Sequence, residues 1–182
     1  TTLKKDSLTI SNQKQEVSSF EIKLPASAKP GVYRATYNLE GAGFIDVFYN
    51  KENVSFIFNP KYPQQSVAFT KSAENQLYSN YIYDFSKAQQ TLDSIQVAAL
   101  QDPTLNLKEA YKIALKDLNT IQDTYLKASA NKYIAPFIKA SARSNAPEII
   151  TSIDGYLNNI KSTFFNHIDF SNKKLINSSF IT

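Results

Sequence analysis

The sequence predicts an α+β fold in which an N-terminal antiparallel β meander or sandwich packs against a C-terminal antiparallel α-helical region. Three observations predict it. Apolar and polar residues alternate with a period of two from Leu8 to about Thr70, and apolar residues recur every three or four positions after Lys71. Three of the four Gly and four of the seven Pro lie in the first part, as a turn-rich meander requires. No change in composition marks a linker, so we expect a β-rich part (residues 1–71) and a helical part (residues 72–182) to pack as one unit.

Turn residues divide the N-terminal part into short strands. Pro30-Gly31 and Gly41-Ala42-Gly43 are turn signals, Asn50–Asn53 is predicted as a hairpin connection, and Asn59–Pro63 as a loop. The strands expected between these signals are Phe20–Leu24, Val32–Leu39, Phe44–Tyr49, Val54–Phe58 and Ser66–Thr70.

Two long amphipathic helices are the clearest elements of the second part. Ser72 is a plausible N-cap with Glu74 in the first turn, and apolar stripes predict helices over 72–100 and 106–130, separated by Asp102-Pro103. Shorter helices are expected within 131–143, where Pro136 sets the start, from the cap at Asn145-Ala146-Pro147 to Phe164, and from Ser171 to Ile176.

The alternating and helical stripes together predict a core. We expect it to include the following apolar residues: Phe20, Ile22, Val47, Phe56, Phe58, Phe85, Leu92, Leu118, Ile153 and Leu157.

Composition excludes several classes of function. The chain of 182 residues has no Cys, which excludes disulfides, thiol catalysis, Cys-ligated zinc and iron–sulfur clusters. A single histidine excludes a multi-His metal site within one chain. The net charge of +4 includes no basic stripe, which argues against nucleic acid as a partner, and no apolar run is long enough for a membrane span. Nothing in the sequence indicates a cofactor.

Two sets of residues could carry catalysis, and both have a structural interpretation that we favour. His167 precedes Asp169 by two positions, which fits a base and its orienting carboxylate but also a histidine at a helix end. Paired carboxylates could serve glycoside hydrolysis, although most lie off the apolar stripes: Asp84, Asp93, Asp102, Glu109, Asp117 and Asp123. We therefore expect no enzymatic activity from this chain, and no catalytic, cofactor-binding or metal-binding residue in it.

The candidate partner surface is a tyrosine cluster early in the first long helix. Tyr78, Tyr81 and Tyr83 span more of the helix circumference than one core stripe, so at least one of them is expected to face a partner or the sheet. The alternative is a helix packed on two sides inside the domain.

Three segments resemble a known family. Pro30–Arg34, Ser72–Tyr78 and Phe164–Asn172 together resemble the N-terminal region of exported thioredoxin-like proteins of Bacteroidetes, over roughly residues 17–182. In that family a β-rich domain of unknown function and a helical segment precede a thioredoxin fold with a C-x-x-C pair. This chain lacks that pair, so no catalytic residue carries over.

The resemblance implies a location in the periplasm or cell envelope and a setting of thiol–disulfide exchange. It implies a non-catalytic module that binds a partner or client, sets an oligomeric state or positions a redox domain. Asp6-Ser7-Leu8 and Asp93-Ser94-Ile95 also resemble O-glycosylation triplets of exported proteins from that group, and Asn53 and Asn177 begin N-x-[ST] sequons. The alternative function is a stand-alone envelope protein that binds a peptide or glycan.

Overall fold

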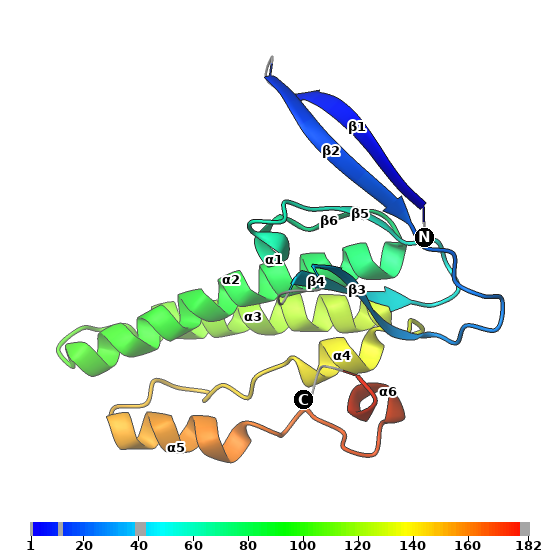
Figure 1. The fold of residues 1–182 in the computed structure, drawn as a ribbon. Coiled ribbons are helices and arrows are strands. Elements are labelled where there is room, and N and C mark those ends of the chain that lie inside the picture. Colours follow the sequence, from blue (N-terminus) through cyan, green and yellow to red (C-terminus); the bar gives the residue numbers. More distant parts are fainter. Residues whose placement is uncertain (1, 11–12, 39–42, 179–182) are drawn as a thin grey trace.

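The computed structural model describes residues 2–10, 13–38 and 43–178, and Figure 1 shows their arrangement. It confirms the α+β class, with antiparallel strand pairs toward the N-terminus and helices toward the C-terminus. The strands are β1 (Thr2–Ile10), β2 (Gln13–Glu21), β3 (Gly31–Asn38), β4 (Gly43–Tyr49), β5 (Ser55–Ile57) and β6 (Ala68–Lys71). The helices are α1 (Pro63–Ser66), α2 (Ala73–Gln101), α3 (Lys108–Ser129), α4 (Ala135–Ala140), α5 (Ile153–Thr163) and α6 (Lys173–Ile176).

The described strands form three separate two-stranded ribbons rather than one continuous meander. β1 pairs with β2, β3 with β4, and β5 with β6, all antiparallel. The expectation that Asn50–Asn53 closes a hairpin is therefore wrong, because this segment leads from one ribbon to another. The reason is that the edge of β4 that β5 would pair with is already occupied at Phe48, whose backbone N–H and C=O both bond to the Asn75 side chain.

The β1–β2 ribbon extends away from the rest of the molecule (Figure 1). This position explains why two expected core residues are not core. Phe20 lies near the end of β2 and Ile22 follows it, and both side chains are exposed because no layer covers them.

The main core lies where α2, α3 and α4 meet one face of β4. α2 and α3 lie side by side as an antiparallel pair (Figure 1), close to the predicted 72–100 and 106–130. Val47, Phe85, Leu92 and Leu118 are buried as predicted. Phe56 and Phe58, by contrast, are only half-buried. The remaining large, fully buried apolar side chains are Tyr81, Ile134, Phe137, Ile138 and Leu175.

The segment 141–152 is not helical, so the helix predicted from Asn145-Ala146-Pro147 begins later. Its backbone is held instead by side chains of α2 and α3. Gln96 Nε2 donates to Ile150 O at 2.8 Å, Ile150 N donates to Gln96 Oε1 at 2.9 Å, and the Tyr111 hydroxyl donates to Ala146 O at 2.9 Å. These bonds satisfy polar groups that a helix would otherwise pair internally. α5 therefore starts at Ile153, with Ser152 as the N-cap that accepts from Gly155 N.

Two further core predictions, both on α5, are wrong because no described element covers these side chains. Ile153 and Leu157, both expected inside, are exposed at 65% and 44%. The shorter elements differ less. α4 covers only 135–140 of the predicted 131–143, with Pro136 in its first turn, and Asn172 rather than Ser171 caps α6.

The buried stripe gives a direct test of the packing. We predict that Leu92→Ala or Leu118→Ala lowers the free energy of unfolding by about 2–5 kcal/mol, because each leaves a cavity between α2 and α3. Ile153→Ala is the control, because Ile153 is exposed, and it should change the free energy of unfolding by less than about 0.5 kcal/mol. Urea denaturation followed by circular dichroism measures both values. Similar losses for Leu92→Ala and Ile153→Ala would contradict the core described here.

Buried tyrosines predict alkaline instability. Burial raises the pKa values of Tyr78, Tyr81, Tyr111 and Tyr133 above the ordinary range, and burial with the Asp84 carboxylate raises the pKa of Tyr125 to about 12. The unfolded chain releases these protons near pH 10, so stability is intact below about pH 10 and falls as pH rises toward the folded-state values.

Absorbance at the tyrosinate band measures this effect without interference, since the chain contains no Trp. We predict that part of the tyrosine titration is delayed in the folded protein and coincides with loss of the circular dichroism signal. A single titration of all tyrosines near pH 10, with the fold intact, would contradict the prediction.

Candidate functional site

The site is built around the first turn of α2, where Ser72, Glu74 and Asn75 form what we call the junction. Asn75 is 2% exposed, and its amide faces the edge of β4. Asn75 Oδ1 accepts from Phe48 N at 2.8 Å, and Asn75 Nδ2 donates to Phe48 O at 2.7 Å. One side-chain amide therefore satisfies both backbone groups of Phe48, as a neighbouring strand would.

Glu74 connects the junction to α4. Its carboxylate is buried and accepts from the backbone N–H groups of Tyr133 (3.1 Å) and Ile134 (3.2 Å), which lie just before α4. Asn50 Nδ2, after β4, donates to Glu74 Oε1 at 2.9 Å. A buried carboxylate is tolerated here because these donors surround it.

Ser72 connects α2 to the segment between β4 and β5, and Gln76 connects α2 to β6. Ser72 adopts φ 91°, a positive value that is uncommon outside Gly. Its hydroxyl donates to Glu52 Oε1 at 2.5 Å and accepts from Asn75 N at 3.2 Å, which offsets the strain. Gln76 Nε2 donates to Phe69 O at 2.9 Å and holds β6 beside the helix.

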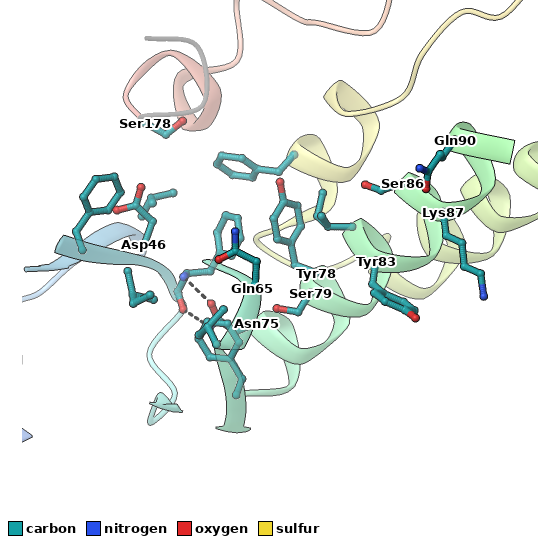
Figure 2. Close-up of a pocket in the computed structure, with 18 residues that line it drawn as sticks. Asp46, Gln65, Asn75, Tyr78, Ser79, Tyr83, Ser86, Lys87, Gln90 and Ser178 are labelled. Atoms are coloured by element: carbon teal, nitrogen blue, oxygen red, sulfur yellow. Dashed lines mark hydrogen bonds between the residues drawn. The ribbon is translucent and has the colours of Figure 1, made fainter. Parts of the chain in front are cut away.

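An open groove lies between the elements that the junction holds (Figure 2). It has a volume of about 960 Å³. β3 and β4 form one wall, α1 and β6 another, and the first half of α2 runs along it. Its apolar lining consists of Val32, Phe44, Ile45, Phe48, Val67, Phe69, Tyr78, Ile82, Tyr83 and Phe137. Its polar and charged lining consists of Asp46, Gln65, Asn75, Ser79, Ser86, Lys87, Gln90 and Ser178.

The structure separates the three tyrosines of the predicted partner surface. Tyr78 is half-buried in the groove with its ring centroid 4.8 Å from that of Phe48, and Tyr83 is 69% exposed in the groove (Figure 2). Tyr81 is 0% exposed, and its hydroxyl donates to Gln122 Oε1 at 2.8 Å. Tyr81 is thus a core residue and no part of a surface. Partner binding by Tyr78 and Tyr83 stays a prediction.

Charge in the groove is mixed. Arg34 donates to both carboxylate oxygens of Asp46, at 2.7 and 2.8 Å, and its guanidinium carbon lies 3.7 Å from the centroid of the Phe44 ring. Lys87 is exposed on α2. The groove therefore combines aromatic surface with amides, hydroxyls and charges of both signs.

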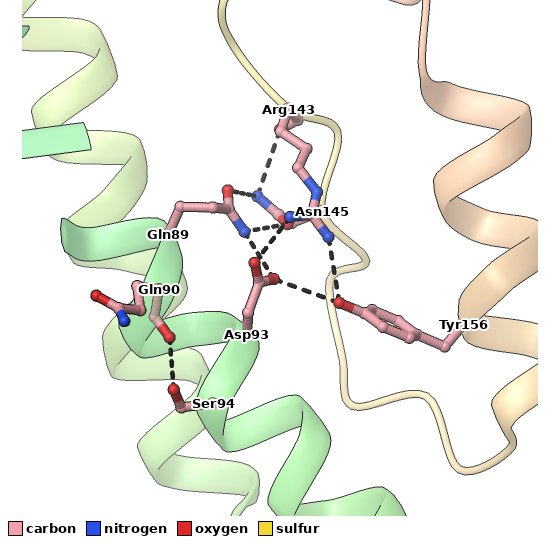
Figure 3. A network of polar contacts seen from close by, with 7 residues as sticks. All are labelled: Gln89, Gln90, Asp93, Ser94, Arg143, Asn145 and Tyr156. Atoms are coloured by element: carbon pink, nitrogen blue, oxygen red, sulfur yellow. Dashed lines mark hydrogen bonds and ion pairs between the residues drawn. The ribbon is translucent and has the colours of Figure 1, made fainter. Parts of the chain in front are cut away.

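A second, smaller hollow of about 460 Å³ lies farther along α2, beside a polar network (Figure 3). Arg143 Nη1 bonds to Asp93 Oδ2 at 2.8 Å, and Gln89 Nε2 donates to Asp93 Oδ1 at 3.0 Å. Gln89 and Asn145 exchange two hydrogen bonds of 2.9 Å, and Arg143 Nη2 donates to Tyr156 Oη at 3.2 Å. The network joins α2 to the 141–152 segment and α5, and the carboxylate of Asp93 is used within it.

His167 and Asp169 do not combine as the catalytic interpretation requires. His167 Nε2 lies 2.9 Å from Ser144 Oγ, a contact with no sequence signal because the two residues come from separate segments. Asp169 Oδ1 instead accepts from Ser171 N (2.9 Å) and Ser171 Oγ (2.6 Å), and these bonds lower the pKa of Asp169.

Most of the other candidate carboxylates have structural partners. Asp84 accepts from the Tyr125 hydroxyl at 2.5 Å, and Asp102 accepts from Thr104 Oγ1 at 2.6 Å, which contributes to lowering the pKa of Asp102. Glu109 pairs with Lys112 at 3.4 Å, while Asp117 and Asp123 are exposed.

The modification motifs differ in accessibility. Ser94 is exposed, but its hydroxyl donates to Gln90 O at 2.8 Å within α2. Asn53 and Asn177 are exposed. The surroundings of the Asp6-Ser7-Leu8 side chains lie outside what the structure describes.

The described residues contain no group of three or more His, Cys, Asp or Glu side chains placed to hold a metal ion. No helix among them combines the length and apolar character needed to cross a membrane. Comparisons with protein-family models, with curated proteins and with solved structures find no match to this chain.

The junction can be tested by an isosteric substitution. We predict that Asn75→Asp lowers the free energy of unfolding by about 2–4 kcal/mol, because it removes the donor to Phe48 O and turns a carboxylate toward that carbonyl. Asn80→Asp, on the exposed side of the same helix, is the matched control and should cost less than about 0.5 kcal/mol. Equal stability of the two variants in urea at neutral pH would contradict the role given to Asn75.

Proposed function

We propose that this chain is a non-catalytic binding module that holds an extended segment of a protein client or partner in the groove along α2. We further propose that it serves as an accessory part of an exported thioredoxin-like protein in the periplasm or cell envelope. The observation that carries the proposal is the groove itself. Its lining combines aromatic rings with amides and hydroxyls, and it includes two exposed apolar side chains, Ile82 and Tyr83.

The chemistry of the groove fits a polypeptide. Tyr78, Tyr83 and Phe69 offer ring surface to apolar side chains. An extended segment also carries backbone donors and acceptors, which need polar partners when they leave water. The side chains of Gln65, Ser79, Ser86 and Gln90 line the same groove and can both donate and accept. Exposed tyrosine beside such groups is typical of protein recognition surfaces.

Other ligands fit less well. Nucleic acid would require a row of cations, whereas the groove lining includes Lys87 and the carboxylate of Asp46 but no such row. A glycan could use the amides of Gln65 and Gln90 beside the aromatic rings of the groove, but its hydroxyls would leave the mostly apolar lining without apolar partners. The hollow near Asp93 supplies polar groups, but Gln89 and Asp93 already bond to each other, to Asn145 and to Arg143.

The resemblance supports the redox setting. The segment Ser72–Tyr78 includes the whole junction, and Pro30–Arg34 begins β3, opposite the strand that the junction holds. Two of the three segments that carry the resemblance therefore contribute to the groove, through Val32, Asn75 and Tyr78. Since the chain contains no Cys, thiol–disulfide exchange would be carried out by thiols of another polypeptide segment.

The binding test uses an unfolded polypeptide as the probe. A fluorescently labelled protein, kept unfolded by carboxymethylation of its cysteines, is titrated with the chain and followed by fluorescence anisotropy. We expect saturable binding that Tyr83→Ala or Ile82→Lys weakens at least about tenfold, since each removes apolar contact at the groove.

Ile113→Lys is the matched control, because Ile113 is an exposed isoleucine on α3 outside the groove. It should leave the affinity unchanged. Absence of binding, or equal affinity of the groove variants and the wild-type chain, would overturn the proposed function.

A further inference from the structure

α5 is an amphipathic helix whose apolar stripe is only partly covered by the rest of the described chain. All eleven residues of α5 are described, and none of them is buried. Ile153 and Leu157 on its apolar stripe are exposed at 65% and 44%, and Phe164, directly after the helix, at 65%. A short helix owes most of its stability to the burial of such a stripe, so one with two large apolar side chains this exposed is unusual.

The segment after α5 enlarges this apolar surface. Phe165 and Phe170 are 56% and 55% exposed. The ring centroids of Phe164 and Phe165 lie 4.8 Å apart and those of Phe165 and Phe170 lie 5.6 Å apart, so the three rings form one continuous cluster. With Ile153 and Leu157 the exposed apolar area is on the order of 500 Å², within the range of patches that are often functional. We call this surface the α5 face.

The charges beside the stripe indicate which partner fits. Asp154 lies in the first turn of α5 and Lys161 in the last turn, about two turns apart and therefore on the same flank of the stripe. When two copies of a helix pack antiparallel about a two-fold axis, the same flank of each helix meets, and the start of one helix lies beside the end of the other. Asp154 of one copy then faces Lys161 of the second, and the reverse.

The apolar residues satisfy the same symmetry. An axis near the middle of α5 places Ile153 opposite Phe164 of the second copy and Leu157 opposite its half-buried Ile160. A parallel arrangement would bring the two Asp154 side chains to the same end and leave both Lys161 side chains at the other. The charges thus select the antiparallel arrangement.

We propose that the α5 face is the contact surface of a homodimer, in which α5 pairs antiparallel with α5 of a second copy through the Ile153–Phe164 stripe and reciprocal Asp154–Lys161 ion pairs. The surface is separate from the groove along α2 and does not depend on the proposed function. About 500 Å² on each partner is below the size of standard stable interfaces, so the dimer is weak and reversible, with dissociation in the micromolar range or above.

Sedimentation equilibrium of the chain over micromolar to submillimolar concentrations tests the proposal. The wild-type chain should show a concentration-dependent monomer–dimer equilibrium. Asp154→Lys and Lys161→Asp should each raise the dissociation constant at least tenfold, because each places like charges opposite one another on both sides of the axis. The double variant Asp154→Lys with Lys161→Asp should restore the wild-type constant, since the reciprocal pairs return with opposite sign.

A matched control separates pairing from net charge. Asp117→Lys combined with Lys161→Asp has the same net charge as the double variant Asp154→Lys with Lys161→Asp. Because Asp117 lies on α3, outside the α5 face, this control should keep the weakened dissociation constant of Lys161→Asp. Leu157→Ser should yield a monomer, with the fold checked by circular dichroism.

Three results would overturn the proposal. One is a wild-type chain that stays monomeric throughout the concentration range. Another is a dimer that Leu157→Ser leaves unchanged. The third is a double swap no better than the single variants. If the chain is monomeric and Leu157→Ser weakens binding of the unfolded probe, the α5 face belongs to the client and not to a second copy.

Discussion

The pairing of one side-chain amide with one strand residue determines the arrangement of the rest of the molecule. Asn75, at the start of α2, satisfies both backbone groups of Phe48 in β4, and the ring of Phe48 packs between Tyr78 and Phe137. Glu74, the preceding residue, holds the start of α4 through two backbone N–H groups. Strand, long helix and short helix therefore meet at two consecutive side chains. The buried position makes these bonds strong, and it also makes each of them costly to lose.

This pairing has a consequence for the surface. A side chain at the edge of β4 prevents another strand from continuing the sheet at Phe48, so β5 pairs with β6 on its own and the ribbons stay separate. The space left between the ribbons and the helix is the groove. The proposed binding site is thus a result of the same interaction that holds the two parts of the chain together, which ties its shape to the stability of the fold.

The periodicity of apolar residues is sufficient to predict the long amphipathic helices. The stripes through Leu92 and Leu118 predicted α2 and α3 closely, and the Ser72 cap was identified from residue type and position. The 141–152 segment could not be predicted in this way, because its conformation depends on Gln89, Gln96 and Tyr111, which lie far away in the sequence. The tyrosine cluster marks the right region of α2, and the spacing of three and four residues already places Tyr81 on the apolar stripe, but that Tyr83 lines a groove follows only from the fold. The groove has no sequence signature, since its walls come from separate segments.

The proposed function requires that a protein segment binds in the groove along α2. NMR chemical-shift mapping of the isotope-labelled chain during titration with the unfolded, carboxymethylated polypeptide would locate the bound segment. The largest shifts should occur at Phe69, Ile82, Tyr83 and their groove neighbours, with α5 unaffected in dilute protein. Shifts confined to α5 and the phenylalanine cluster after it, with the groove unchanged, would contradict the claim and move the binding site to the opposite part of the helical region.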